Sequence, residues 1–75
     1  MRARYHISPC DNGDWKVKKE GAVRPSAVFE NKVDAIDRGR DLAKASPLGQ
    51  LIIYKQSGVI QTEYTYGKDP YPPKG

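Results

Sequence analysis

The chain has 75 residues, the size of one small domain, and carries 13 Lys and Arg against 9 Asp and Glu for a formal net charge of +4. Its hydrophobic fraction of 37% is enough for one folded core and argues against disorder along the whole chain. The single Cys and single His exclude an internal disulfide, a zinc site of several thiolates and a His-rich metal site. No apolar run approaches the ~20 residues of a membrane span, and the charged start is unlike a secretion signal, so we expect a cytoplasmic protein.

Residues 2–19 are typical of a β-hairpin. Within them, residues 2–8 and 14–19 alternate between apolar and polar side chains, which is the pattern of half-buried strands. The dipeptide Asn12-Gly13 lies between the two segments and predicts a tight turn, because both residues tolerate positive φ. Trp15 is the large anchor on the apolar side of this hairpin.

A short third strand is expected within residues 23–29, and because Pro25 cannot donate to a ladder, this strand should lie at a sheet edge or be irregular. One helix follows. Asn31 is a favourable N-cap residue, and Asp34 lies three residues later, close to the arrangement of a capping box. The predicted packed face of the helix holds Val33, Ala35, Ile36, Gly39, Leu42 and Ala43. Gly39 on that face indicates a close approach of the helix to the sheet.

Residues 51–54 and 59–64 form a second hairpin around a Gln-Ser-Gly turn. The resulting order is β-β-(β)-α-β-β. Short connections favour antiparallel neighbours, and a sheet with one apolar face needs a covering layer. The sequence therefore predicts an α+β fold: a single domain over residues 1–65, with an antiparallel sheet of four or five strands and one helix packed on one face. Residues 66–75 are predicted to form a Pro-rich C-terminal tail.

The chain resembles a family of small bacterial proteins, domain-of-unknown-function family 2188. The resemblance spans nearly the whole chain, and its most specific part is the tail Tyr-Gly-x-Asp-Pro-x-Pro-Pro-Lys-Gly at residues 66–75. Further matching segments are Tyr5-His6-Ile7-Ser8-Pro9, Trp15-Lys16-Val17-Lys18, Gly39-Arg40 and Leu51-Ile52-Ile53. The chain departs from the pattern at Lys68, where Asn is common, and at the hairpin tip of residues 54–58. The resemblance implies a bacterial or phage setting and supplies no activity.

A weaker likeness links residues 14–45 to the arm-type DNA-binding domains of phage integrases. The shared features are Trp15 on a strand, a glycine turn, a third strand with Arg and Ser, and a Phe-x-Asn-Lys segment that enters the helix. In that module a three-stranded sheet lies in the major groove, so the likeness implies DNA binding.

One side of the first hairpin is basic. Arg2, Arg4 and His6 share one face of the first strand, and Lys16 and Lys18 share the matching face of the second. Ile52 and Tyr54 would join them from the second hairpin. A cationic sheet face with an aromatic side chain suits phosphate attraction and base stacking, so we predict weak binding of DNA or RNA here. The alternative is that these side chains bind no ligand. Lys and Arg would then keep an exposed strand face soluble and prevent its strands from pairing with those of other molecules.

No catalytic, metal or cofactor site is predicted. His6 and Cys10 are four residues apart on a strand, about 13 Å, which is too far for a nucleophile and its base. Asp34, Asp37 and Asp41 line one helix side, but interleaved Arg and Lys favour a solvated, ion-paired surface over a metal site. We therefore expect a non-enzymatic binding module with neither a small-molecule substrate nor a membrane partner.

The second functional hypothesis is a protein-interaction module. It would form a homodimer through the sheet edges or through the face that carries Ile52 and Tyr54, or it would bind a partner protein through exposed apolar side chains. The predicted partner-binding residues are Ile52, Tyr54, Tyr66, Pro70, Tyr71, Pro72 and Pro73. The tail has two interpretations: a displayed polyproline ligand, or a segment whose tyrosines fold back on the small core.

Overall fold

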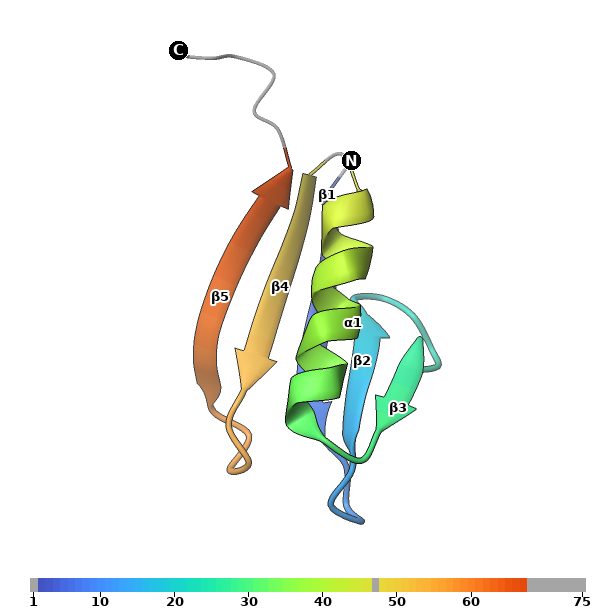
Figure 1. Ribbon diagram of the computed structural model, residues 1–75, viewed down its shortest axis with the longest axis vertical. Coiled ribbons are helices and arrows are strands. Elements are labelled where there is room, and N and C mark those ends of the chain that lie inside the picture. Colours follow the sequence, from blue (N-terminus) through green and yellow to red (C-terminus); the bar gives the residue numbers. More distant parts are fainter. Residues whose placement is uncertain (1, 47, 68–75) are drawn as a thin grey trace.

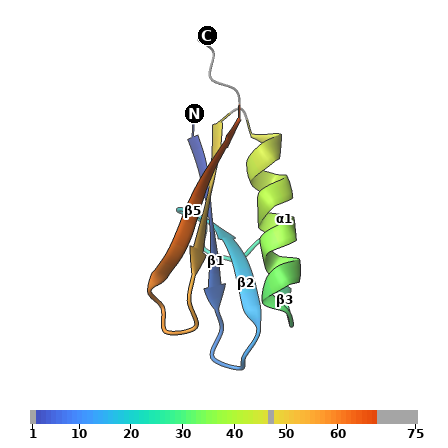
Figure 2. The same ribbon diagram turned by 60° about the vertical axis from the view of Figure 1, so that its left-hand side comes forward.

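The computed structural model describes residues 2–46 and 48–67. Five strands form one sheet in the order β3-β2-β1-β4-β5, and helix α1 packs against one of its faces (Figures 1 and 2). The elements are β1 (Arg2–Pro9), β2 (Trp15–Lys19), β3 (Ala27–Phe29), α1 (Lys32–Ala45), β4 (Leu48–Tyr54) and β5 (Ile60–Gly67). The predicted α+β class, the element order and the position of the helix on one face are confirmed.

The sheet is not antiparallel throughout, because β1 and β4 pair in parallel at its centre, from Arg2 opposite Leu48 to Ile7 opposite Ile53. All other neighbouring strands are antiparallel. The connection through α1 explains the difference. A helix that crosses the sheet carries the chain back to the end from which it started, so the strand after the helix runs parallel to the strand before it. Since β3 runs parallel to β1, β4 does too.

The short strand β3 forms one edge of the sheet, as Pro25 predicted, and begins only after that proline. The first hairpin turns at the expected dipeptide. Gly13 has φ of 93°, in the left-handed region that favours glycine, and its backbone N–H donates to the Cys10 carbonyl at 3.2 Å. Strand β5 extends through Gly67, so Tyr66 and Gly67 belong to the sheet.

Helix α1 begins after Asn31, but the capping interaction differs from the prediction. The Asn31 side chain makes no hydrogen bond to the helix backbone; its amide donates to the Asp34 carboxylate at 3.4 Å. The placement of Val33 on the packed face was wrong, since this side chain is 66% exposed. Two residues of helix correspond to about 200° of rotation, which puts Val33 nearly opposite the buried Ala35.

The core lies between α1 and the sheet. Its buried residues are Ala3, Tyr5, Ile7, Trp15, Val17, Ala35, Ala43, Leu51 and Ile53, and Phe29, Ile36, Leu42 and Tyr66 pack against them. Two glycines allow the close approach of the layers. A Cβ on Gly39 would lie 2.6 Å from the Ile7 Cδ1 atom, and a Cβ on Gly49 would overlap the backbone carbonyl of Ala43. Gly39 of α1 and Gly49 of β4 therefore allow the short distance between the helix and strands β1 and β4.

Candidate functional site

The helix covers one face of the sheet and leaves the other uncovered (Figure 2). We refer to this other surface as the open face, defined by Arg4, His6, Ser8, Lys16, Lys18, Ile52 and Tyr54. Strand register brings these residues together. His6 lies opposite Lys18 and Ser8 opposite Lys16 on β2, and His6 also pairs with Ile52 on β4. Residues that face each other across a pair point to the same side, so alternation places this group away from the core.

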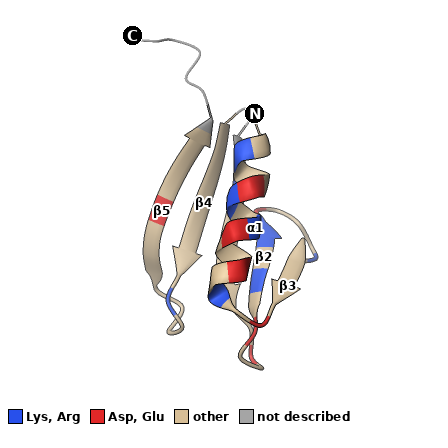
Figure 3. Ribbon diagram, in the orientation of Figure 1, with Lys and Arg blue, Asp and Glu red and all other residues tan. Residues whose placement is uncertain are grey.

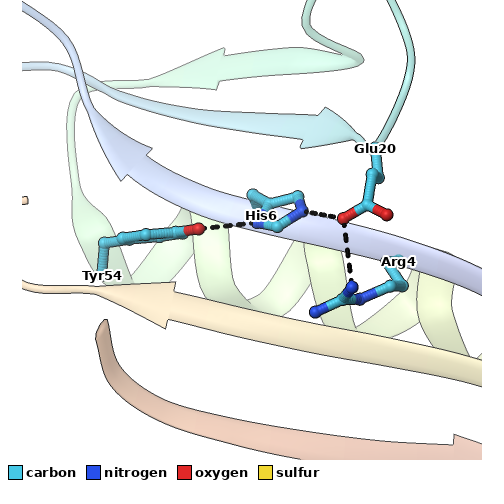
Figure 4. A network of polar contacts seen from close by, with 4 residues as sticks. All are labelled: Arg4, His6, Glu20 and Tyr54. Carbon is cyan, nitrogen blue, oxygen red and sulfur yellow. Dashed lines mark hydrogen bonds and ion pairs between the residues drawn. The ribbon is translucent and has the colours of Figure 1, made fainter. Parts of the chain in front are cut away.

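A polar network crosses the open face (Figure 4). The His6 Nε2 atom lies 3.0 Å from Oε1 of Glu20, and Nδ1 lies 3.0 Å from the hydroxyl of Tyr54. An ionised carboxylate only accepts, so in the neutral imidazole the proton resides on Nε2, and Nδ1 accepts the hydroxyl proton of Tyr54. Both ring nitrogens of His6 are therefore engaged, and the network joins β1 to β4 and to the turn after β2.

Arg4 joins the same carboxylate. Its terminal nitrogen lies 3.4 Å from Oε1 of Glu20, with the two side chains 39% and 51% exposed. An ion pair this exposed contributes little to stability, about 0–1 kcal/mol. Its main effect is on the charge of the surface, because Glu20 offsets one of the cations on β1.

Beside this network lies an open pocket of about 310 Å³ between β1, β2 and the turn that follows β2. It is lined by His6, Ser8, Lys16, Lys18, Lys19, Glu20 and Gly21. We refer to it as the lysine pocket. Within the described residues, neither Lys16 nor Lys18 has a carboxylate partner, so both ammonium groups are available to an anion.

The predicted site residues do not all lie together. Arg4, His6, Lys16 and Lys18 share the open face with Tyr54, whose hydroxyl is bound to His6. Ile52 also belongs to that face, but it is 1% exposed, so the prediction that it offers apolar surface to a partner was wrong. It lies in register between His6 on β1 and Glu63 on β5. With a neighbouring strand on each side, Ile52 is buried although no helix covers this face, so residues 51–53 form a run of three buried residues.

The remaining predicted residues lie at or beyond the ends of the described segments. Arg2 belongs to β1, but its side chain lies outside the described residues, as do Pro70, Tyr71, Pro72 and Pro73. Both interpretations of the tail, as a displayed ligand or as a segment folded back on the core, therefore stay predictions. Tyr66 is half-buried, stacks on Tyr64 with ring centroids 6.2 Å apart and lies beneath Lys44 of α1.

Sequence reasoning missed Glu20, whose carboxylate contacts Arg4 and His6 of the open face. The signal was present in the alternation, since Lys16, Lys18 and Glu20 are spaced by two residues. The backbone N–H of Glu20 still donates to the Arg4 carbonyl at 2.7 Å, so this residue continues the β1–β2 pairing beyond the end of β2. Ser8 of β1, Lys19 of β2 and Gly21 in the turn after β2 were also missed, because only the strand register shows which residues border the pocket.

The outer side of α1 carries mixed charges (Figure 3). Asp37 accepts from Arg40 at 3.2 Å, one turn away, in an exposed ion pair. Across residues 2–46 and 48–67, no group of three or more His, Cys, Asp or Glu side chains is placed to hold a metal ion. No helix in the same residues has the length and apolarity to cross a membrane.

Comparison with known proteins supports the family indicated by the sequence. A family model described as "Uncharacterized protein conserved in bacteria (DUF2188)" matches residues 5–66. The chain belongs to this family. It is also similar to the "Uncharacterized protein YycD" of Bacillus subtilis (strain 168), with 30% identity over 67 residues that cover 88% of this chain and all of the relative. No solved structure matches the chain significantly. The likeness to integrase arm-type domains stays a prediction.

Proposed function

We propose that the chain is a non-enzymatic module that binds DNA or RNA weakly through phosphate contacts on the open face. The observation that carries this proposal is the lysine pocket, in which Lys16, Lys18 and Lys19 border a cavity that the helix does not cover. Its volume of about 310 Å³ is at the lower end of the range of small-ligand sites, ~300–1,000 Å³. A cytoplasmic location, where nucleic acid is accessible, is part of the same proposal.

The open face favours phosphate contact over base reading. Tyr54 is tied to His6, and Ile52 is buried, so few aromatic or apolar groups are available for stacking. Lysine ammonium groups bind phosphate as point charges without sequence preference. Binding of this kind depends strongly on salt and is weak, with Kd of about 10⁻⁴–10⁻⁶ M at physiological salt.

The absence of catalysis is also part of the proposal. Both nitrogens of His6 are engaged by Glu20 and Tyr54, so the ring has no free nitrogen to take a proton from a substrate. A general base must lie within hydrogen-bond reach of the proton that it removes. The network therefore suits a structural role on the binding surface.

The test measures affinity for short mixed-sequence single strands and duplexes of DNA and RNA by fluorescence anisotropy as the salt concentration rises. For single strands, log K falls against log salt with a slope of about −0.7 per phosphate contact, so loss of two contacts reduces the slope by about 1.4. We expect this reduction, with at least a tenfold loss of affinity at low salt, in the double variant Lys16→Ala/Lys18→Ala.

The control is Arg38→Ala/Lys55→Ala, which removes the same charge at two exposed positions outside the open face. It should retain the slope of the unmodified chain. Equal losses in both double variants would assign the binding to net charge alone, and no salt-dependent affinity for any of the four probes would remove the proposal.

A further inference from the structure

Strand β5 leaves a long edge of the sheet unpaired. It is the outermost strand, and β4 pairs with it along one side from Leu48 opposite Gly67 to Tyr54 opposite Ile60. Within the described residues, no strand pairs with its other side. The edge is 8 residues long, against 3 residues for β3 at the opposite end of the sheet. An edge of this length presents a row of unpaired N–H and C=O groups to another chain.

The usual protections of a free edge are weak in β5. Proteins block edge pairing with Lys, Pro or a bulge. Between Ile60 and Gly67 the only charged residue is Glu63, and there is no Lys or Pro. The register irregularity occurs at its beginning, opposite Ile53 and Tyr54, and the rest of the strand is regular. Ile60 and Tyr64 are 47% and 48% exposed, so the edge also offers apolar surface.

We propose that the chain forms a homodimer in which β5 pairs antiparallel with β5 of a second copy, about a two-fold axis at Tyr64. A two-fold axis perpendicular to the sheet is the symmetry that makes identical edge strands antiparallel neighbours. It places both helices on one side and both open faces on the other. The result is one continuous sheet through the two copies.

The position of the axis follows from the side chains of β5. An axis at Glu63 would set two carboxylates directly opposite each other, which destabilises a strand pair. An axis at Thr62 or Thr65 would leave fewer residues of each strand paired. An axis at Tyr64 pairs residues 61–67 of both copies and sets Glu63 opposite Thr65 of the partner subunit. Of these four axis positions, the one at Tyr64 pairs the most residues without setting two carboxylates opposite each other.

The Tyr64 register also joins aromatic side chains. Tyr64 meets Tyr64 of the partner subunit, and Tyr66 lies opposite Thr62 of the partner subunit. Tyr64 and Tyr66 already stack within one copy at an interplanar angle of 27°. Their rings would form one aromatic cluster across the axis on the helix side, where aromatic cross-strand pairs stabilise a sheet. The half-exposed ring of Tyr64 thereby gains a partner.

Sedimentation equilibrium of the full chain, from about 10 µM to about 1 mM, tests the dimer by mass action. We expect concentration-dependent dimers. Tyr64→Lys should shift the dimer dissociation constant at least tenfold towards monomer, because it sets two ammonium groups across the axis, and Tyr64→Phe should retain the dimer. Val28→Lys is the matched control, since Val28 is 51% exposed on the other edge strand, and it should dimerise normally.

A second measurement does not depend on any variant. In a mixture of isotope-labelled and unlabelled chains, isotope-filtered NMR should show contacts between Thr62 of one copy and Tyr66 of the other. A chain that stays monomeric up to about 1 mM overturns the proposal. So does a dimer that Tyr64→Lys leaves intact, or one without the filtered contacts. None of these experiments contains nucleic acid, so their outcome is independent of the function proposed for the open face.

Discussion

Glu20 shows how one residue sets the charge of the open face. Its carboxylate lies 3.0 Å from His6 and 3.4 Å from Arg4, so under the proposed function it would compete with phosphate oxygens for these two side chains. It also borders the lysine pocket. The carboxylate therefore repels an anion that enters the pocket and occupies donors that could bind it.

Replacing Glu20 with Gln is expected to raise affinity for single-stranded nucleic acid. The amide keeps a similar shape but removes one negative charge, and exposed charge interactions of up to about 1 kcal/mol correspond to a gain of roughly twofold to fivefold. The gain should fade as salt rises, because exposed charges are screened. Anisotropy titrations at low and high salt provide the measurement.

Glu30→Gln is the control for that substitution, because Glu30 is exposed in the bend between β3 and α1 and its loss changes the net charge equally. It should have a smaller effect. Unchanged or weaker binding by the Glu20 variant would mean that this carboxylate does not compete with the ligand.

At the scale of elements, the contact between α1 and β4 depends on backbone approach. Gly49 of β4 lies against the backbone of α1, and a side chain at this position would overlap the carbonyl group of Ala43. Gly39 is less restrictive, because a Cβ there would meet the ends of the Ile7 and Leu51 side chains at 2.6 and 2.8 Å. Side chains can shift more readily than a helix backbone. The two glycines therefore differ in how well each tolerates alanine.

Gly49→Ala is expected to lower the free energy of unfolding by about 1–3 kcal/mol or more, because helix and strand must separate to admit the methyl group. Gly39→Ala should be less harmful, since its overpacking is partly offset by a gain in helix propensity of up to about 1 kcal/mol. Urea denaturation followed by circular dichroism measures both. If Gly39→Ala destabilised the protein more than Gly49→Ala, the backbone of α1 would be able to move away from β4 at little cost in free energy.

The whole molecule has a thin core, since a chain of this size buries only about 60% of the surface that its unfolded form exposes. Its total stability is expected to be about 4–11 kcal/mol, from about 0.05–0.15 kcal/mol per residue. A single central side chain therefore accounts for a large share. Leu51 is completely buried in β4 and belongs to the core cluster.

Leu51→Ala is expected to remove about 2–5 kcal/mol and leave much of the chain unfolded at moderate temperature. Val23→Ala provides the comparison, because Val23 is 92% exposed and its loss should change stability by less than about 0.5 kcal/mol. Thermal unfolding followed by near-ultraviolet circular dichroism of Trp15 reports on both. Similar melting temperatures for the two variants would contradict the assignment of the core.

The kinds of element, their order and the two faces of the first hairpin could all be predicted from the amino-acid sequence. Alternation at a period of two placed Trp15 and Val17 in the core and Lys16 and Lys18 on the other side, because strand geometry is local. The start of the helix after Asn31 was likewise a local property.

How these elements meet depends on contacts between segments that lie far apart in the chain. His6 reaches Tyr54 and Glu20 across 48 and 14 residues of chain, so the network depends on strand register. The parallel pairing of β1 with β4 depends on the crossover through α1, and the burial of Ile52 depends on having a strand on each side of β4. A local pattern specifies the direction of a side chain from its own strand. The neighbours of that side chain come from segments far away in the sequence, and only folding brings these segments together.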